Sequence, residues 1–150
     1  MIHLIETDAH HDHLRGLIEE LDAYLFQLYP PDEVFLVDFE APSANDIRFV
    51  IAYSDNRPIG CGAIKPLDEN SAELKRFYVI QDFRNRGIAG MMLDKLEKMA
   101  RESGYASLKL ETGEPQAEAV AFYRRHGYEA IERFGEYADC PSSLCYEKQL

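Results

Sequence analysis

A short basic turn in the sequence has the residue types of an anion-binding site. The segment "DFRNRGIAGMM" places Arg84 and Arg86 around an asparagine, and Gly87 follows where a helical pattern begins. A helix start leaves peptide N–H groups without partners and concentrates positive potential, and glycine lets a phosphate approach the backbone. The GxGxxG and GxxxxGK[ST] phosphate-binding motifs are absent. The turn alone therefore fits either an anion site or an ordinary helix start.

The elements that must position this turn follow from the spacing of apolar residues. Helical spacing extends over residues about 10 to 28 and again from Ile88 to Ala100, and a third helix is expected at "QAEAVAFYRRHG". Strands are expected at "IHLIE", "DIRFVIAYS", "RPIGCGAIKPL", "AELKRFYVI", "YASLKLET", "YEAIERF" and "SLCYEKQL". The order β-α-β-β-β-α-β-α-β-β predicts an α/β fold, with helices flanking a mixed, mostly antiparallel sheet of about six or seven strands.

Length and composition restrict the class of protein. The 150 residues, 46% of them apolar and 29% charged, predict a single domain over residues 1–150. There is no apolar run long enough for a bilayer and no signal-peptide pattern, so no membrane partner is expected. A net charge of −11 argues against nucleic-acid binding. The three cysteines form no CxxC pair, which favours a reducing, cytoplasmic location.

The cluster "HHDH" at residues 10–13 has four side chains of types that bind metals. Consecutive residues of a helix point in different directions and do not converge on one ion. We therefore expect a solvated helix start here and no metal in the protein.

Two separated motifs resemble those of the GNAT acetyltransferases. The first is "LKRFYV" (residues 74–79) followed by "RNRGIAG" (residues 84–90), which is similar to a strand and a Q/R-x-x-G-x-G/A loop of that family. The second is "QAEAVAFYRRHGYEAI" (residues 116–131), which is similar to the family's N-x-x-A-x-x-x-Y-x-x-x-G-F segment. The resemblance covers residues about 47 to 132 and implies the GNAT fold, with acetyl-coenzyme A as cosubstrate.

The resemblance also implies how the coenzyme is held. The backbone of Phe77, Tyr78 and Val79 would pair with the pantetheine arm, and a peptide N–H of Phe77 or Val79 would polarise the thioester carbonyl. The loop that would hold the pyrophosphate consists of Arg84, Asn85, Arg86, Gly87, Ile88, Ala89 and Gly90. Gln116 replaces the family's usual asparagine near the pantetheine, which keeps the amide but lengthens the side chain.

The reaction that the resemblance implies is the transfer of an acetyl group to a primary amine by direct attack on the thioester. An alkylammonium group has a pKa of roughly 10 and must first lose a proton. Glu73 matches a family position from which a glutamate serves as the base in some members, and strand periodicity puts it on the face of Phe77 and Val79. Glu111, which ends "LKLE", is the competing candidate. Tyr123 matches the tyrosine that protonates the departing thiolate.

The acceptor is expected opposite the coenzyme, between the first helix, the loop after it and the last hairpin. By family analogy this region includes Tyr24, Tyr29, Glu111 and Tyr137. Aromatic rings beside carboxylates suit a small amine through cation–π contacts and ion pairs. We therefore expect a small molecule or an amino-acid derivative as the acceptor.

A second class of function stays open at this point. A GNAT-fold domain could bind an acyl-coenzyme A as a sensor or scaffold, and such a domain needs only the loop. The presence of Tyr123 and Glu73 favours the enzyme. The sequence leaves open the acceptor's identity, the acyl-chain length and the oligomeric state, a homodimer included.

Overall fold

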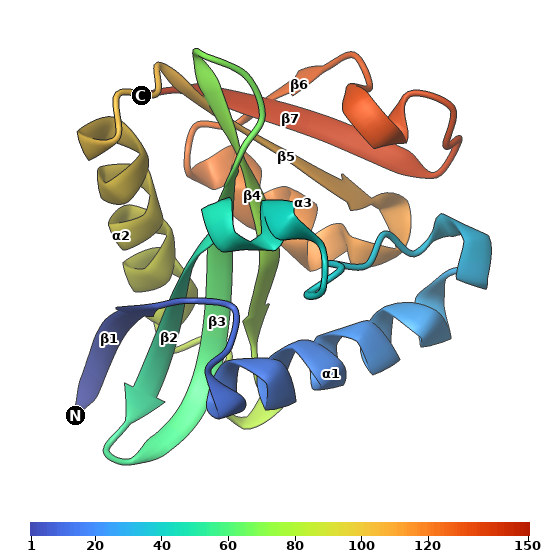
Figure 1. The fold of residues 1–150 in the computed structure, drawn as a ribbon. Helices are drawn as coiled ribbons and strands as arrows, with labels where there is room; N and C mark the ends of the chain where they lie inside the picture. Colours follow the sequence, from blue (N-terminus) through green and yellow to red (C-terminus); the bar gives the residue numbers. More distant parts are fainter.

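A seven-stranded sheet with the order β1-β2-β3-β4-β5-β7-β6 forms the centre of the computed structural model, which describes residues 1–150 (Figure 1). Its strands are β1 (Ile2–Thr7), β2 (Arg48–Ser54), β3 (Arg57–Pro66), β4 (Ser71–Val79), β5 (Ser107–Gly113), β6 (Glu129–Ile131) and β7 (Ser143–Gln149). Three helices accompany it, α1 (Asp12–Leu28), α2 (Ile88–Glu102) and α3 (Ala117–Arg125). All neighbouring strands pair antiparallel except β4 and β5. The predicted α/β fold and order of elements are confirmed.

The first helix forms because its apolar residues recur on one side. Leu14, Leu17, Ile18 and Leu21 are buried, and the first three pack in one core cluster with residues of β2 and β3. The side chain of His11 caps the helix start by accepting a hydrogen bond from the N–H of His13 at 3.2 Å. The helix ends before the two prolines of "YPPDE", which cannot continue it.

The histidines at this helix start form no metal site. No three histidine, cysteine, aspartate or glutamate side chains are grouped closely enough to hold an ion. None of the three helices combines the length and the apolarity needed to cross a membrane.

Helices α2 and α3 share a second core cluster with strands β4 and β5. Leu93 and Leu96 of α2 lie in this cluster with Tyr123 of α3. The start of α2 approaches the end of α3 closely, because a Cβ placed on Gly90 would lie 3.6 Å from the ring of His126. The start of α2 therefore lies close to the end of α3, and both helices contribute residues to the second core cluster.

The sheet opens in the middle. Strands β4 and β5 pair only where Ser71–Glu73 meets Ser107–Lys109. Beyond these pairs β4 keeps its partner β3 and β5 keeps its partner β7, but the two strands no longer bond to each other. The residues that follow, 74–79 on β4 and 110–113 on β5, thus present free backbone edges toward one another.

A β-bulge interrupts β4 beside this opening. Lys75 pairs with Ala63 and Tyr78 with Cys61, so two residues of β4, Arg76 and Phe77, lie opposite the single residue Gly62. Arg76 has a φ of 50°, in the left-handed region. The extra residue reverses the alternation of side chains along the rest of the strand.

The bulge corrects one expectation. Strand periodicity placed Glu73 on the same face as Phe77 and Val79, and this is wrong. By register, Glu73 shares a face with Lys75 and Tyr78, whereas Phe77 points to the opposite face, where it lies against the position of Gly62. The side chains of Glu73 and Phe77 therefore lie on opposite faces of the sheet.

Candidate active site

The predicted phosphate loop joins β4 to α2 and exposes its backbone. Asn85 and Gly87 have φ values of 62° and 81°, and Gly87 is the N-cap of α2. No backbone hydrogen bond has a donor among residues 85–90. Consecutive unpaired N–H groups at a helix start, with left-handed residues between them, form a concave site for an anion. Ile88 is buried and anchors this site to the core.

The two arginines of the loop differ in their surroundings. Arg84 is held back against β4, since its Nε donates to the carbonyl oxygen of Val79 at 2.9 Å. Its guanidinium also lies over the rings of Tyr78 and Tyr24, at 5.7 and 5.9 Å from their centres. Arg86 is exposed. Tyr24, expected beside the acceptor, thus borders the phosphate loop.

The free edge of β4 carries the peptide groups that were predicted to meet the thioester. The N–H of Ile80 donates to the carbonyl of Ile59 on the β3 side at 2.9 Å. Alternate residues of a strand direct their N–H groups to opposite edges, so the N–H of Val79 faces the opening, as does that of Phe77. The contact of Arg84 with the Val79 carbonyl lies at the same edge.

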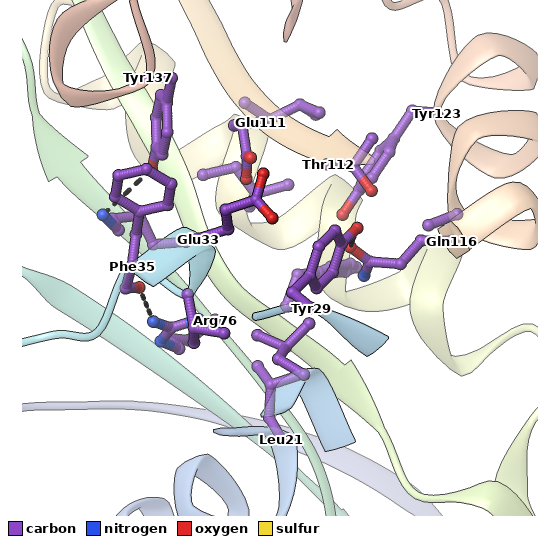
Figure 2. A pocket seen from close by; sticks show the side chains of 17 residues that line it. Leu21, Tyr29, Glu33, Phe35, Arg76, Glu111, Thr112, Gln116, Tyr123 and Tyr137 are labelled. Carbon is purple, nitrogen blue, oxygen red and sulfur yellow. Dashed lines mark hydrogen bonds between the residues drawn. The ribbon is translucent and has the colours of Figure 1, made fainter. Parts of the chain in front are cut away.

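A cavity of about 110 Å³ lies between the separated strands, beneath the loop that follows α1 (Figure 2). It brings together residues from across the chain. Of those predicted from the sequence, Tyr29, Phe77, Glu111, Gln116, Tyr123 and Tyr137 line it. Tyr24 and Glu73 are not among the lining residues.

Tyr29 links the end of α1 to Gln116, the residue predicted to lie near the pantetheine. Its hydroxyl donates to Oε1 of Gln116 at 2.8 Å. The ring lies directly against Gly113, because a Cβ at that position would be 2.1 Å from the hydroxyl. Burial, followed by the charge of Glu111, raises the pKa of Tyr29 to about 12. The amide expected near the pantetheine is therefore oriented by the side chain of the residue that directly follows α1.

Tyr123 is buried among aromatic rings on the other wall. Its ring centre lies 6.1 Å from that of Phe77, 5.5 Å from that of Phe122 and 5.8 Å from that of Tyr128. Burial raises the pKa of Tyr123 above its ordinary value of 10.0. The hydroxyl therefore keeps its proton near neutral pH and can donate it.

Glu111 is the carboxylate on the cavity wall with a pKa suited to proton transfer. One of its oxygens accepts a hydrogen bond from Ser143 Oγ at 2.6 Å. Burial raises its pKa to about 7, against the opposing effect of the Ser143 hydrogen bond, and the charge of Glu73 adds to the rise. A general base works best when its pKa lies close to the working pH.

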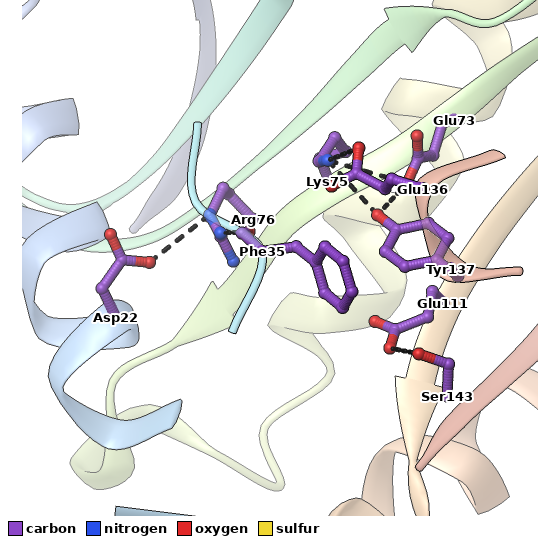
Figure 3. A network of polar contacts seen from close by, with 9 residues as sticks. All are labelled: Asp22, Phe35, Glu73, Lys75, Arg76, Glu111, Glu136, Tyr137 and Ser143. Carbon is purple, nitrogen blue, oxygen red and sulfur yellow. Dashed lines mark hydrogen bonds and ion pairs between the residues drawn. The ribbon is translucent and has the colours of Figure 1, made fainter. Parts of the chain in front are cut away.

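Glu73 belongs to a buried network behind the cavity wall (Figure 3). It accepts a hydrogen bond from the hydroxyl of Tyr137 and lies 3.8 Å from Lys75 Nζ. Lys75 also lies 3.6 Å from Glu136 and donates to the Tyr137 hydroxyl at 3.2 Å. Burial raises the pKa of Glu73, although Lys75 and Tyr137 oppose this. Glu73 itself does not line the cavity, but its neighbours Lys75 and Tyr137 both do.

Sequence reasoning missed four polar residues of the cavity. Arg76 donates to the carbonyl oxygen of Phe35 and lies 3.4 Å from Asp22, so it connects the bulge, α1 and the loop that covers the cavity. The other three are Glu33, Lys75 and Thr112. A charged residue inside the apolar strand "ELKRFYV" was a usable signal for Arg76, whereas "YPPDE" holds no signal for Glu33.

The chain belongs to the Acetyltransferase (GNAT) family, whose sequence model matches residues 14–128. As a member it is an acetyltransferase with acetyl-coenzyme A as cosubstrate. It is 41% identical to a protein of Azospirillum brasilense named IAA acetyltransferase, over 89% of this chain and 88% of that relative. It is 29% identical to YsnE of Bacillus subtilis (strain 168), an uncharacterized N-acetyltransferase, over 81% and 82% of the two chains.

Solved structures show the same fold. A Klebsiella pneumoniae protein matches with a TM-score of 0.86 and 29% identity, over 100% of this chain and 98% of that one. The PaiA N-acetyltransferase of Thermoplasma acidophilum, solved with coenzyme A, matches with a TM-score of 0.74 and 20% identity over 100% and 99% of the two chains. The fold recognised from the two motifs is thus confirmed over the full length of this chain.

Proposed function

We propose that this enzyme transfers the acetyl group of acetyl-coenzyme A to the primary amine of a small molecule, by direct attack of the amine on the thioester. The observation that carries the proposal is the cavity between β4 and β5. Within it Glu111, with a pKa of about 7, and the protonated Tyr123 line the same space beside the free edge of β4. One group can accept a proton and the other can donate one.

The free backbone groups support a position for the coenzyme. The N–H groups of residues 85–90, together with Arg84, suit a pyrophosphate, and the pantetheine arm would occupy the opening between β4 and β5. A peptide N–H of Phe77 or Val79 would then stabilise the negative charge that develops on the thioester oxygen. The fold shared with PaiA, which was solved with coenzyme A, supports this placement.

The proposed step moves one proton onto Glu111 and one from Tyr123. Glu111 takes a proton from the ammonium group, directly or through a water molecule, and the nitrogen lone pair attacks the carbonyl carbon. A C–N bond forms and the C–S bond breaks. The thiolate of coenzyme A leaves and receives the proton of Tyr123. The second proton that the nitrogen loses as the amide forms returns to the Tyr123 oxygen, directly or through water, so that Glu111 alone holds the net proton that solvent then removes.

The geometry supports Glu111 over Glu73 as the base. Glu111 lines the cavity, whereas the carboxylate of Glu73 accepts from Tyr137 and lies beside Lys75 behind the wall. A proton from the cavity would reach Glu73 only through a neighbouring side chain, Tyr137 or Lys75. Substituting Glu111 and Glu73 separately by glutamine distinguishes the two roles, because only the base sets the pH dependence of the reaction.

Two measurements test the proposed function. Saturating acetyl-coenzyme A should stabilise the native protein, by about 2.7 kcal/mol at a ligand concentration 100 times the Kd. Release of free coenzyme A should then depend on an added primary amine. Stabilisation by acetyl-coenzyme A without release in the presence of any amine would instead support the sensor or scaffold role.

A further inference from the structure

The charges on the cavity wall are not balanced. Its two basic residues have acidic partners of their own, because Lys75 lies beside Glu73 and Glu136, and Arg76 lies beside Asp22. Its two carboxylates, Glu33 and Glu111, form no ion pair with any basic group of the protein. The cavity therefore has an excess of negative charge.

Glu33 has one carboxylate oxygen available to a ligand. The hydroxyl of Ser142 donates to Oε1 at 2.9 Å, and the thiol of Cys140 approaches the same oxygen at 3.8 Å. These two contacts leave Oε2 without a partner. Figure 2 shows the Glu33 side chain extending into the cavity toward Glu111. The loop after α1 thus presents a second carboxylate to the space where the acceptor would bind.

A buried hydroxyl gives a second indication of a polar ligand. Thr112 is 4% exposed, it lines the cavity, and its Oγ1 has no hydrogen-bond partner in the protein. A buried polar group without a partner costs free energy, and a ligand that bonds to it removes that cost. A molecule with several N–H groups fits this wall better than an apolar one.

We propose that the acceptor carries two cationic nitrogen atoms, one that reacts at Glu111 and a second that Glu33 binds. This inference rests on the proposed function. In that reaction Glu111 loses its charge when it takes the proton of the reacting ammonium group, so it cannot also hold a second cation. Glu33 takes no part in this proton transfer and stays available to bind the second nitrogen. The acceptor class is a short aliphatic diamine, and the cavity disfavours amines that carry a carboxylate, because both basic side chains are already paired.

Matched acceptors that differ only at the far end test this inference. The native enzyme is assayed for coenzyme release with 1,3-diaminopropane, 1,4-diaminobutane and 1,5-diaminopentane, and with propylamine, butylamine and pentylamine. For at least one chain length we expect the diamine to have a kcat/KM about 10- to 100-fold above that of the monoamine, the range for a hydrogen bond to a charged group. 4-Aminobutanoate should be a poorer acceptor than butylamine.

Two variants assign the preference to Glu33. Glu33→Gln should bring the ratio of diamine to monoamine kcat/KM close to one, whereas Asp32→Asn, at the exposed neighbour in the same turn, should retain the native ratio. Thermal stabilisation of Glu33→Gln by acetyl-coenzyme A shows that the variant is folded. A native diamine preference that persists in this folded variant would overturn the assignment to Glu33.

The remaining outcomes separate the inference from the proposed function. If monoamines and diamines of every length react equally well, the inference is overturned and the proposed acetyl transfer stands. If no amine of any kind causes coenzyme release while acetyl-coenzyme A still stabilises the protein, the proposed function and the inference both fail.

Discussion

Replacing Glu111 by glutamine should stabilise the protein and inactivate it at the same time. In the native chain the pKa of Glu111 rises from its ordinary value of 4.5 to about 7, because burial disfavours the charged form. Between these two values the folded state holds a proton that the unfolded state has released. The native protein therefore loses stability as the pH rises through this window, and the glutamine variant does not.

The magnitude follows from the same two values. The pKa of Glu111 rises from 4.5 to about 7 on folding. At about 1.4 kcal/mol per pKa unit, this rise lowers the free energy of unfolding by about 3 kcal/mol above pH 7. The free energies of unfolding of native protein and variant should differ least near pH 4.5, and the variant should be more stable by up to about 3 kcal/mol above pH 7. Urea unfolding at pH 5 and pH 8 measures the difference. Glu129→Gln, on the exposed edge strand β6, is the control, with no such gain expected.

The activity of the same variant gives the second measurement. Native kcat/KM should rise with pH through about 7 as Glu111 becomes deprotonated, and Glu111→Gln should lose about 10²- to 10⁴-fold and with it this rise. Two results would refute the reasoning: an unchanged pH profile of activity in the variant, or identical pH dependences of unfolding for variant and native protein.

Further substitutions test the rest of the site. Tyr123→Phe should lower turnover about 10²-fold and leave acetyl-coenzyme A binding nearly intact, and unchanged turnover would exclude it as the acid. Gly113→Ala should destabilise by about 1–3 kcal/mol, because its Cβ would collide with Tyr29, which orients Gln116. That cost should disappear in a Tyr29→Ala background, and a cost that persists there would contradict the collision. Arg84→Ala should raise the Kd of acetyl-coenzyme A about 10- to 100-fold in calorimetric titration, and an unchanged Kd would remove Arg84 from the site.

The sequence predicts candidate site residues most directly where a motif has fixed spacing along the chain. The turn at residues 84–90 and Tyr123 each lie in a short segment whose residue types are tied to one local conformation. Glu111 and Tyr29 were also named in advance, and the cavity contains both. Nothing in the sequence ranked Glu111 above Glu73, because their pKa values depend on burial and on neighbours far along the chain.

The rest could not be predicted because it depends on contacts between distant segments. Tyr137 meets Glu73 across 64 positions of sequence, and Glu33 meets Ser142 across 109. The bulge at Arg76 lies within a run that has the composition of an uninterrupted strand, and only the shifted pairing with β3 and the φ of 50° at Arg76 reveal the extra residue. The alternation of apolar and polar residues does not reveal a single inserted residue, yet the insertion moves every later side chain of the strand to the other face of the sheet.

The short ladder between β4 and β5 divides the sheet into two halves. One half contains β1 to β4 and the other β5, β7 and β6, and direct backbone pairing joins them only through Ser71–Glu73 and Ser107–Lys109. In the proposed binding mode the pantetheine arm fills the remaining gap as a substitute strand. The cosubstrate would then act as a structural crosslink as well as an acyl donor. Amide hydrogen exchange along both free edges should slow together when it binds, and the empty enzyme should be able to open along this line without unfolding either half.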